Sequence, residues 1–136
     1  MKTSWLPFLI ILVVIGGALF VVRMIYVADK SERDLHALIC TIDVVEAYVN
    51  EYGRWPDSWD DLENVKGSKR SSIYEWPRHR TEIERRIDVD FGLDLDDIDF
   101  TVDSLEFPIR CRDVYYIEHD HRFQFLIEAV EKHRQK

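Results

Sequence analysis

The chain has 136 residues and a formal net charge of −8, a length that suits one modest domain. The first 28 residues contain two basic residues and no acidic residue. Residues 29–136 therefore hold 16 basic and 26 acidic residues, a net charge of −10. A domain with this charge repels phosphate groups, which argues against nucleic acid as a partner.

An apolar segment lies near the N-terminus. Residues 5–22 are 18 consecutive residues without charge, and the apolar segment extends to Val27. As a helix, residues 5–27 would be roughly 34 Å long, against about 30 Å for a hydrocarbon core. Trp5 and Tyr26 would then lie at opposite interfaces. We predict a transmembrane anchor over residues 1–28, with the lipid bilayer as its partner.

A cleaved signal peptide is the alternative interpretation of this segment. Lys2 supplies a basic start, and Gly16, Gly17 and Ala18 resemble a small-residue cleavage site. Cleavage there would leave the apolar residues 19–22 at the new N-terminus, whereas cleavage sites are normally followed by polar sequence. Retention of the segment is therefore favoured.

The basic residues that flank the segment are nearly balanced. Lys2 and the α-amino group precede it, whereas Arg23, Lys30 and Arg33 follow or end it. A very short tail before the span usually stays in the cytoplasm in a bacterial signal-anchor. We therefore expect a single-pass membrane protein with an exported, extracytoplasmic C-terminal domain.

A second helix is predicted directly after the anchor. Apolar residues recur in steps of three and four over residues 31–52, which is one stripe of an α-helix. The stripe consists of Leu35, Leu38, Ile42, Val45, Val49 and Tyr52. Gly53 follows as a stop, and no proline or glycine prevents continuity with the anchor. The stripe is interpreted as packing on its own domain, with a self-association seam as the alternative.

The turn after this helix contains two tryptophans. Pro56 favours an extended Trp55, and Ser58 with Asp61 forms a capping box for a short helix through residue 62. We predict that Trp55, Pro56 and Trp59 form a structural latch over the long helix. An exposed tryptophan pair that binds a ligand or partner is the alternative.

The remaining chain predicts a small antiparallel sheet and a terminal helix. Residues 72–76 form a candidate short strand, and residues 83–91 alternate apolar and polar side chains as a half-buried strand does. Residues 105–116 contain a further strand candidate. A helix from about Asp120 completes the α+β domain of residues 29–136.

The order of a hydrophobic helix, an amphipathic helix, a Gly-x-Trp-Pro break and a small sheet resembles type IV pilin-like proteins, especially type II secretion pseudopilins. The matching residues are Ala47, Tyr48, Tyr52, Gly53, Arg54, Trp55, Pro56 and Leu62. The prepilin cleavage motif, with its glycine and glutamate, is missing from residues 1–10. The resemblance therefore implies architecture more than filament assembly. The Trp-Pro-x-Ser-Trp-x-Asp-Leu stretch is also similar to short single-pass proteins of planctomycete-type bacteria, which implies no activity.

Two clusters could hold a divalent metal ion. His119 and His121 belong to the densest polar cluster, but at a helix N-terminus they would point about 200° apart. Asp88 and Asp90 begin an acidic run, yet the fifth, sixth and twelfth positions lack the residues of an EF-hand. Surface positions explain both pairs without a metal ion, so neither pair is a predicted site.

The two cysteines complete the list of reactive groups. Cys40 and Cys111 are an even pair that could form a disulfide in an exported domain. Neither lies in a nucleophile motif, and no glycine-rich phosphate loop is present. We therefore predict a protein without catalysis or cofactor that acts through protein contacts. A pseudopilin-like filament subunit and a metal-binding module are the alternatives.

Overall fold

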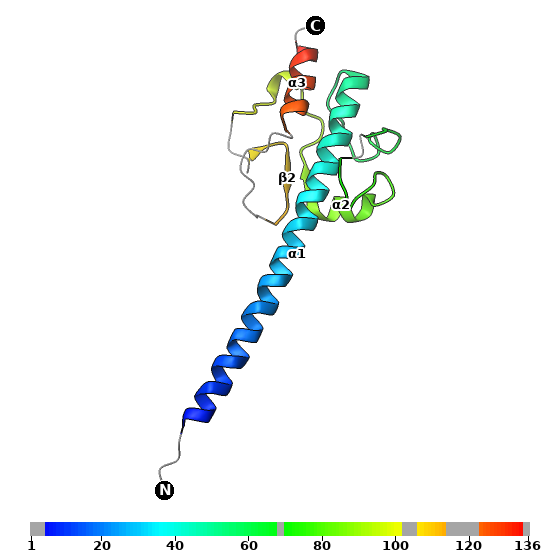
Figure 1. The fold of residues 1–136 in the computed structure, drawn as a ribbon. Coiled ribbons are helices and arrows are strands. Elements are labelled where there is room, and N and C mark those ends of the chain that lie inside the picture. Colours follow the sequence, from blue (N-terminus) through cyan, green and yellow to red (C-terminus); the bar gives the residue numbers. More distant parts are fainter. Residues whose placement is uncertain (1–4, 68–69, 102–105, 114–122, 135–136) are drawn as a thin grey trace. The chain divides into compact units, whose positions relative to one another are not determined.

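The structure is a computed structural model that describes residues 5–67, 70–101, 106–113 and 123–134. Its elements are α1 Leu6–Tyr52, α2 Arg80–Arg86, β1 Ile87–Val89, the 3-10 helix η1 Leu95–Asp97, β2 Ile109–Cys111 and α3 Phe123–Arg134 (Figure 1). The predicted α+β class is confirmed, with a long N-terminal helix, a two-stranded antiparallel sheet and a C-terminal helix. The chain divides into two compact units, Met1–Glu32 and Arg33–Lys136, a boundary slightly beyond the predicted one.

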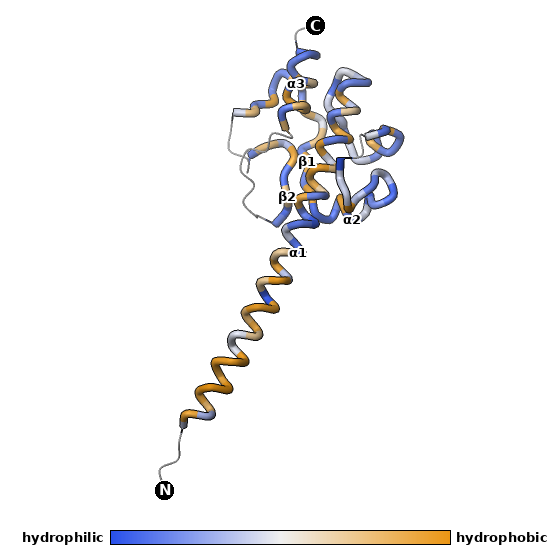
Figure 2. Tube along the Cα trace, in the orientation of Figure 1, coloured by the Kyte–Doolittle hydropathy of each residue, from blue (hydrophilic) through white to orange (hydrophobic). Residues whose placement is uncertain are grey.

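In the first unit, the N-terminal part of α1 is apolar on every face (Figure 2). The large apolar side chains from Trp5 to Tyr26 expose between 54% and 79% of their surface. Among the described residues, α1 is the one helix long and apolar enough to cross a membrane. Its composition therefore suits a hydrocarbon environment better than water.

In the second unit, α1 is the centre of the hydrophobic core. All nine residues from Ala37 to Val45 are buried, and so are Tyr48 and Val49. The sequence predicted a single buried stripe, which was too long at both ends and too narrow around the helix. Leu35 is only half-buried and Tyr52 is exposed, whereas Thr41 and Asp43, which lie outside the stripe, are buried.

The buried polar residues of α1 each have a partner within the unit. Asp34 pairs with Arg86 at 2.6 Å, and Asp43 pairs with Arg70 at 3.0 Å. Thr41 Oγ1 donates to the carbonyl of Ala37 at 2.9 Å. Because a buried carboxylate without a partner is costly, these arginines make full enclosure of the helix possible.

The sheet is short and lies late in the chain. Strand β1 pairs antiparallel with β2, and Ile87 faces Cys111 while Val89 faces Ile109. The pairing continues beyond both strands, because the Asp90 amide donates to the Pro108 carbonyl and the Arg112 amide donates to the Arg86 carbonyl, each at 2.8 Å. Two three-residue strands cannot form a core alone, so they depend on the helices.

The strand predicted over residues 83–91 is partly wrong. Of these residues, the part up to Arg86 belongs to α2 (Arg80–Arg86), and only Ile87–Val89 form a strand. Ile83 and Ile87 are four residues apart, a spacing that fits one face of a helix as well as one face of a strand. Ion pairs of Arg80 with Glu84 at 2.5 Å and of Arg86 with Glu82 at 3.2 Å, both four residues apart, favour the helix.

Two further expected elements are replaced by turns. Instead of a helix through residue 62, the amide of Leu62 donates to the carbonyl of Trp59 at 3.2 Å, and Asp61 reaches back to the Asp57 amide rather than supporting a cap at Ser58. Instead of a strand over residues 72–76, the hydroxyl of Ser71 accepts from the Tyr74 amide at 2.9 Å. Local side-chain bonds thus compete successfully with regular structure.

Helix α3 confirms the predicted C-terminal helix. Phe123, Leu126 and Val130 are buried on one face, as the sequence spacing predicts. Phe107 meets Phe123 edge-on at 5.0 Å between ring centroids, which ties the helix to the residues before β2. The guanidinium of Arg134 donates to the carbonyls of Leu95 and Ile98 and joins α3 to η1.

The central position of α1 makes a prediction about stability. Ile42→Ala should lower the free energy of unfolding by about 2–5 kcal/mol, out of roughly 5–15 kcal/mol for a domain. Ile42→Asp should unfold the second unit, because the carboxylate would have no partner in the core. Tyr52→Asp is the matched control on the same stripe, since Tyr52 is 52% exposed. Limited proteolysis of the full chain compares Ile42→Asp with Tyr52→Asp. Equal resistance of these two variants to the protease would contradict the enclosed helix.

Candidate functional site

The metal candidates Asp88 and Asp90 are paired with arginines in and directly after strand β2. Asp90 receives two hydrogen bonds from Arg110, at 2.7 and 3.0 Å, and Asp88 lies 3.0 Å from Arg112. The carboxylate of Asp90 raises the pKa of Arg110. No group of three metal-binding side chains occurs within the described residues. His119 and His121 lie outside the described residues.

The two cysteines are free thiols, so the possible disulfide is not formed in the structure. Cys40 is buried in α1 and faces the backbone of Trp76. Cys111 is half-buried, and its thiol lies 3.7 Å from the carbonyl of Asp34. Because Asp34 and Cys40 are six residues apart, roughly 9 Å along the helix axis, the two thiols contact different parts of α1.

Burial controls the chemistry of both thiols. It raises the pKa of Cys40 to about 11, with a smaller contribution from Asp43. It raises the pKa of Cys111 to about 12, with smaller contributions from Asp34 and Asp113. Since the thiolate is the nucleophile, neither cysteine is activated at neutral pH.

These pKa values can be tested by alkylation. The thiolate fraction reaches one half only at the raised pKa, so the rate of Cys40 modification by iodoacetamide should keep rising from pH 9 toward pH 11. The urea-denatured chain is the control, and its rate should be half-maximal near the ordinary thiol pKa of about 8.5. Mass spectrometry of the peptides measures both rates. A half-maximal rate near pH 8.5 in the folded chain would contradict the buried thiol.

The same raised pKa affects the stability of the fold. The contribution of this thiol to folding stability is complete below about pH 8.5 and is lost as the pH rises through 11.

The predicted latch residues occupy the turn after α1. Gly53 ends the helix with φ +66°, and its amide donates to the Val49 carbonyl at 2.9 Å. Trp55 is 2% exposed, and its indole N–H donates to the Asp90 carbonyl at 2.8 Å. The Gly92 amide donates to the Pro56 carbonyl at 3.0 Å. The turn is therefore bonded to the residues that follow β1.

Trp59 has a different environment from Trp55. It is half-buried, and its ring lies 5.8 Å from that of Trp76 and meets Phe91 edge-on at 5.4 Å. The indole of Trp76 in turn donates to the Leu62 carbonyl at 2.7 Å. The tryptophan pair is thus divided between the core and an aromatic cluster, and is not one exposed surface.

Substitutions of Trp55 test the latch. Trp55→Ala should lower the free energy of unfolding by about 3–5 kcal/mol through lost burial. Trp55→Phe should cost about 1–3 kcal/mol, because the Asp90 carbonyl loses its donor while much of the packing is kept. Thermal unfolding followed by near-ultraviolet circular dichroism compares the two. Unchanged stability in Trp55→Ala would show that the latch is not structural.

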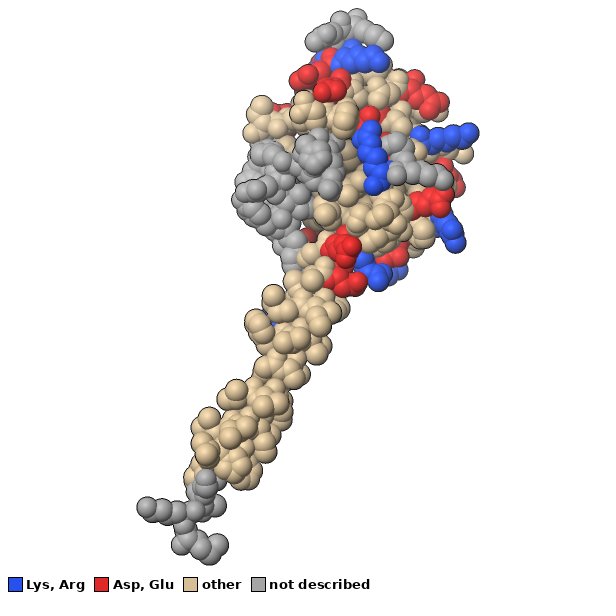
Figure 3. Space-filling model, viewed as in Figure 1, with Lys and Arg blue, Asp and Glu red and all other residues tan. Residues whose placement is uncertain are grey.

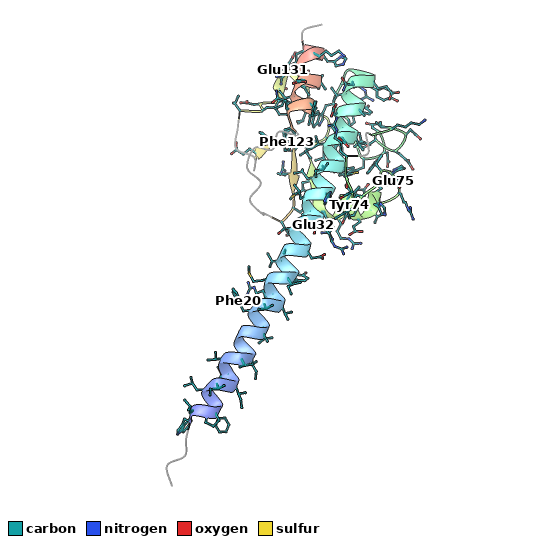
Figure 4. The ribbon with its side chains drawn as sticks, in the orientation of Figure 1. Phe20, Glu32, Tyr74, Glu75, Phe123 and Glu131 are labelled. Carbon is teal, nitrogen blue, oxygen red and sulfur yellow. The ribbon has the colours of Figure 1, made fainter. Side chains whose placement is uncertain are left out.

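A cavity of about 740 Å³ lies beside the Cys40 to Val44 face of α1. Its other walls are residues 63–67, residues 71–77 and His79. Figure 4 labels Tyr74 and Glu75, which belong to the second of these walls. The sequence predicted only a polar loop and a short strand here, so the cavity was missed. Two aromatic residues, Tyr74 and Trp76, were the available signal.

Both chain segments around the cavity are fixed to the helices. Gly67 approaches α1 so closely that a Cβ there would lie 3.0 Å from Val44 Cγ2. The Glu75 amide donates to His79 Nδ1 at 3.0 Å. Tyr74 donates its hydroxyl to Glu82 at 2.8 Å, and burial, followed by this bond, raises the pKa of Tyr74 to about 12. The same bond lowers the pKa of Glu82.

A smaller cavity, of about 410 Å³, lies where the end of α1 meets η1 and α3. Gly53 and Trp55 line it together with Asp94, His133 and other residues. A Cβ on Gly53 would lie 3.1 Å from the His133 ring. This cavity contains backbone turns and mixed charges but no group of three metal ligands among the described residues. It is best explained as a junction between elements.

No protein family model matches the chain, and no curated protein or solved structure shows significant similarity to it. The resemblance to pilin-like proteins therefore stays a prediction from the sequence. The larger cavity is the candidate site that the structure itself supplies. Its size is within the range of about 300–1,000 Å³ typical of ligand sites.

Proposed function

We propose that this chain is a single-pass membrane protein whose C-terminal domain acts through protein contacts and not by catalysis. The observation that carries the proposal is the apolar surface of α1 from Leu6 to Val27. In water, exposed apolar surface costs about 25 cal/mol for each Å². A lipid bilayer removes that cost, and a helix satisfies all its backbone polar groups internally.

The proposed absence of catalysis is supported by the state of the reactive groups. The two thiols have raised pKa values, and the acidic candidates Asp88 and Asp90 are held by arginines. Charged side chains of both signs are interspersed over the visible face of the second unit (Figure 3). Such a surface suits specific contact with another protein better than attraction to a polyanion.

Self-association is the basis of the alternative, a pseudopilin-like filament subunit. The uninterrupted helix from Leu6 to Tyr52 favours this architecture. However, Leu38, Ile42 and Val45 are buried within their own unit, so the predicted seam is not available to a second copy. A filament would have to use the exposed apolar part of α1. The alternative of a metal-binding module has no supporting geometry among the described residues.

Fractionation tests the membrane proposal. The full-length product should remain in the membrane pellet after carbonate extraction and keep its N-terminal mass. Replacing Val14 and Ile15 with arginines should release it, because each charge near the centre of a span costs about 2.5–3.5 kcal/mol on insertion scales. The matched control places the two arginines at Asn50 and Glu51, which are exposed positions near the end of α1.

Recovery of a soluble product that begins at Leu19 would contradict retention of the anchor. Reporter fusions at the C-terminus determine the orientation separately. An alkaline phosphatase fusion should be active. A green fluorescent protein fusion should be dark, because it would be exported as an unfolded chain. The reverse pair of results would place the domain in the cytoplasm and leave the anchor unaffected.

A further inference from the structure

The larger cavity has the composition of a binding site for a small molecule. Its floor is formed by Cys40 and Val44, which are 5% and 1% exposed, and Val65 is also buried. Trp76 and Tyr74 add aromatic walls. Ligand sites are typically concave, mostly apolar and supplied with a few polar groups, and this cavity combines those features.

The charges at the rim indicate what kind of molecule fits. Glu63, Glu75 and Lys66 are the charged residues among those that line the cavity, and His79 accepts a hydrogen bond from the Glu75 amide at Nδ1. Glu63 already lies 3.8 Å from Arg80, so a cationic ligand would compete for an occupied carboxylate. An anionic ligand would approach a domain with a net charge of −10. A neutral molecule has neither disadvantage.

The side chains of the walls further restrict the kind of ligand that fits. The Trp76 ring is fixed by two contacts. Its centroid lies 5.8 Å from that of Trp59, and its indole N–H donates to the Leu62 carbonyl. Aromatic rings pair favourably with other aromatic rings in offset or edge-on arrangements. At the same cavity, the Ser71 oxygen accepts from the Tyr74 amide and its O–H can donate to a ligand, whereas the Ser72 hydroxyl contacts His36 Nε2 at 3.3 Å.

We propose that the cavity between α1 and the segments 63–67 and 71–79 binds a neutral aromatic small molecule that carries a hydrogen-bonding group. The site lies entirely within the second unit, so the proposal does not depend on membrane anchoring. A volume of about 740 Å³ is within the range of small-molecule sites.

The two cysteines provide a test with an internal control. Cys40 lines the cavity, whereas Cys111 lies in β2 beside Asp34 and does not. Both thiols have pKa values raised by burial, to about 11 and about 12, so they react in the same low range. The full chain in lipid nanodiscs is treated with iodoacetamide at pH 8, with increasing 2-naphthol as the probe. Mass spectrometry follows each cysteine separately.

The expected result is a saturable decrease of at least about three-fold in the alkylation rate of Cys40, with the rate of Cys111 unchanged. Ile73→Asp should raise the half-maximal probe concentration about ten-fold, because it places a hydrated carboxylate on the cavity wall. Tyr52→Asp is the matched control, a substitution of an exposed residue at the end of α1 outside the cavity, and should change that concentration less than two-fold.

Three outcomes would overturn the proposal. Equal slowing of both thiols would show a general effect of the probe on the protein or the lipid. No slowing of Cys40 up to the solubility limit of 2-naphthol would show that the cavity does not take this class of molecule. Protection of Cys40 by a tryptophan-containing peptide, but not by 2-naphthol, would assign the cavity to a protein partner instead.

Discussion

The enclosure of one helix by the rest of the domain is the constraint on which the second unit depends. Residues from Ala37 to Val45 of α1 are buried on every face, and the two strands have only three residues each. A sheet of this size buries too little surface to support a fold, so α1 takes the central place. The turns, α2, the sheet and α3 are layers around it.

Full enclosure of a helix that carries carboxylates requires specific partners from outside it. Asp34 depends on Arg86 at the end of α2, and Asp43 depends on Arg70, which also stacks on Phe125 of α3 at 4.7 Å. Removing one member of such a pair leaves an uncompensated buried charge, which is more destabilising than the pair is stabilising. These pairs therefore restrict how the loops can wrap around α1.

The same wrapping creates the candidate site. Residues 63–67 and 71–79 lack regular strand structure, because Ser71 and His79 bond the backbone amides that a strand would have used. The segments consequently arch beside Cys40 and Val44 and leave a cavity between them. A domain held at a membrane by one helix and carrying a small-molecule cavity would combine location with recognition, and neither property needs a reactive group.

Local patterns determined much of this protein from the sequence alone. The apolar segment, the helix stop at Gly53, the burial of Trp55 and the face of α3 follow from composition, backbone preference and periodicity, which act over a few residues. The tertiary structure decided the rest. Ile83 and Ile87 fit either a helix or a strand, so only their surroundings could select α2. The pairing of Asp34 with Arg86, 52 residues later, and the cavity beside Cys40 depend on which distant segments meet, and that information is not contained in any local pattern.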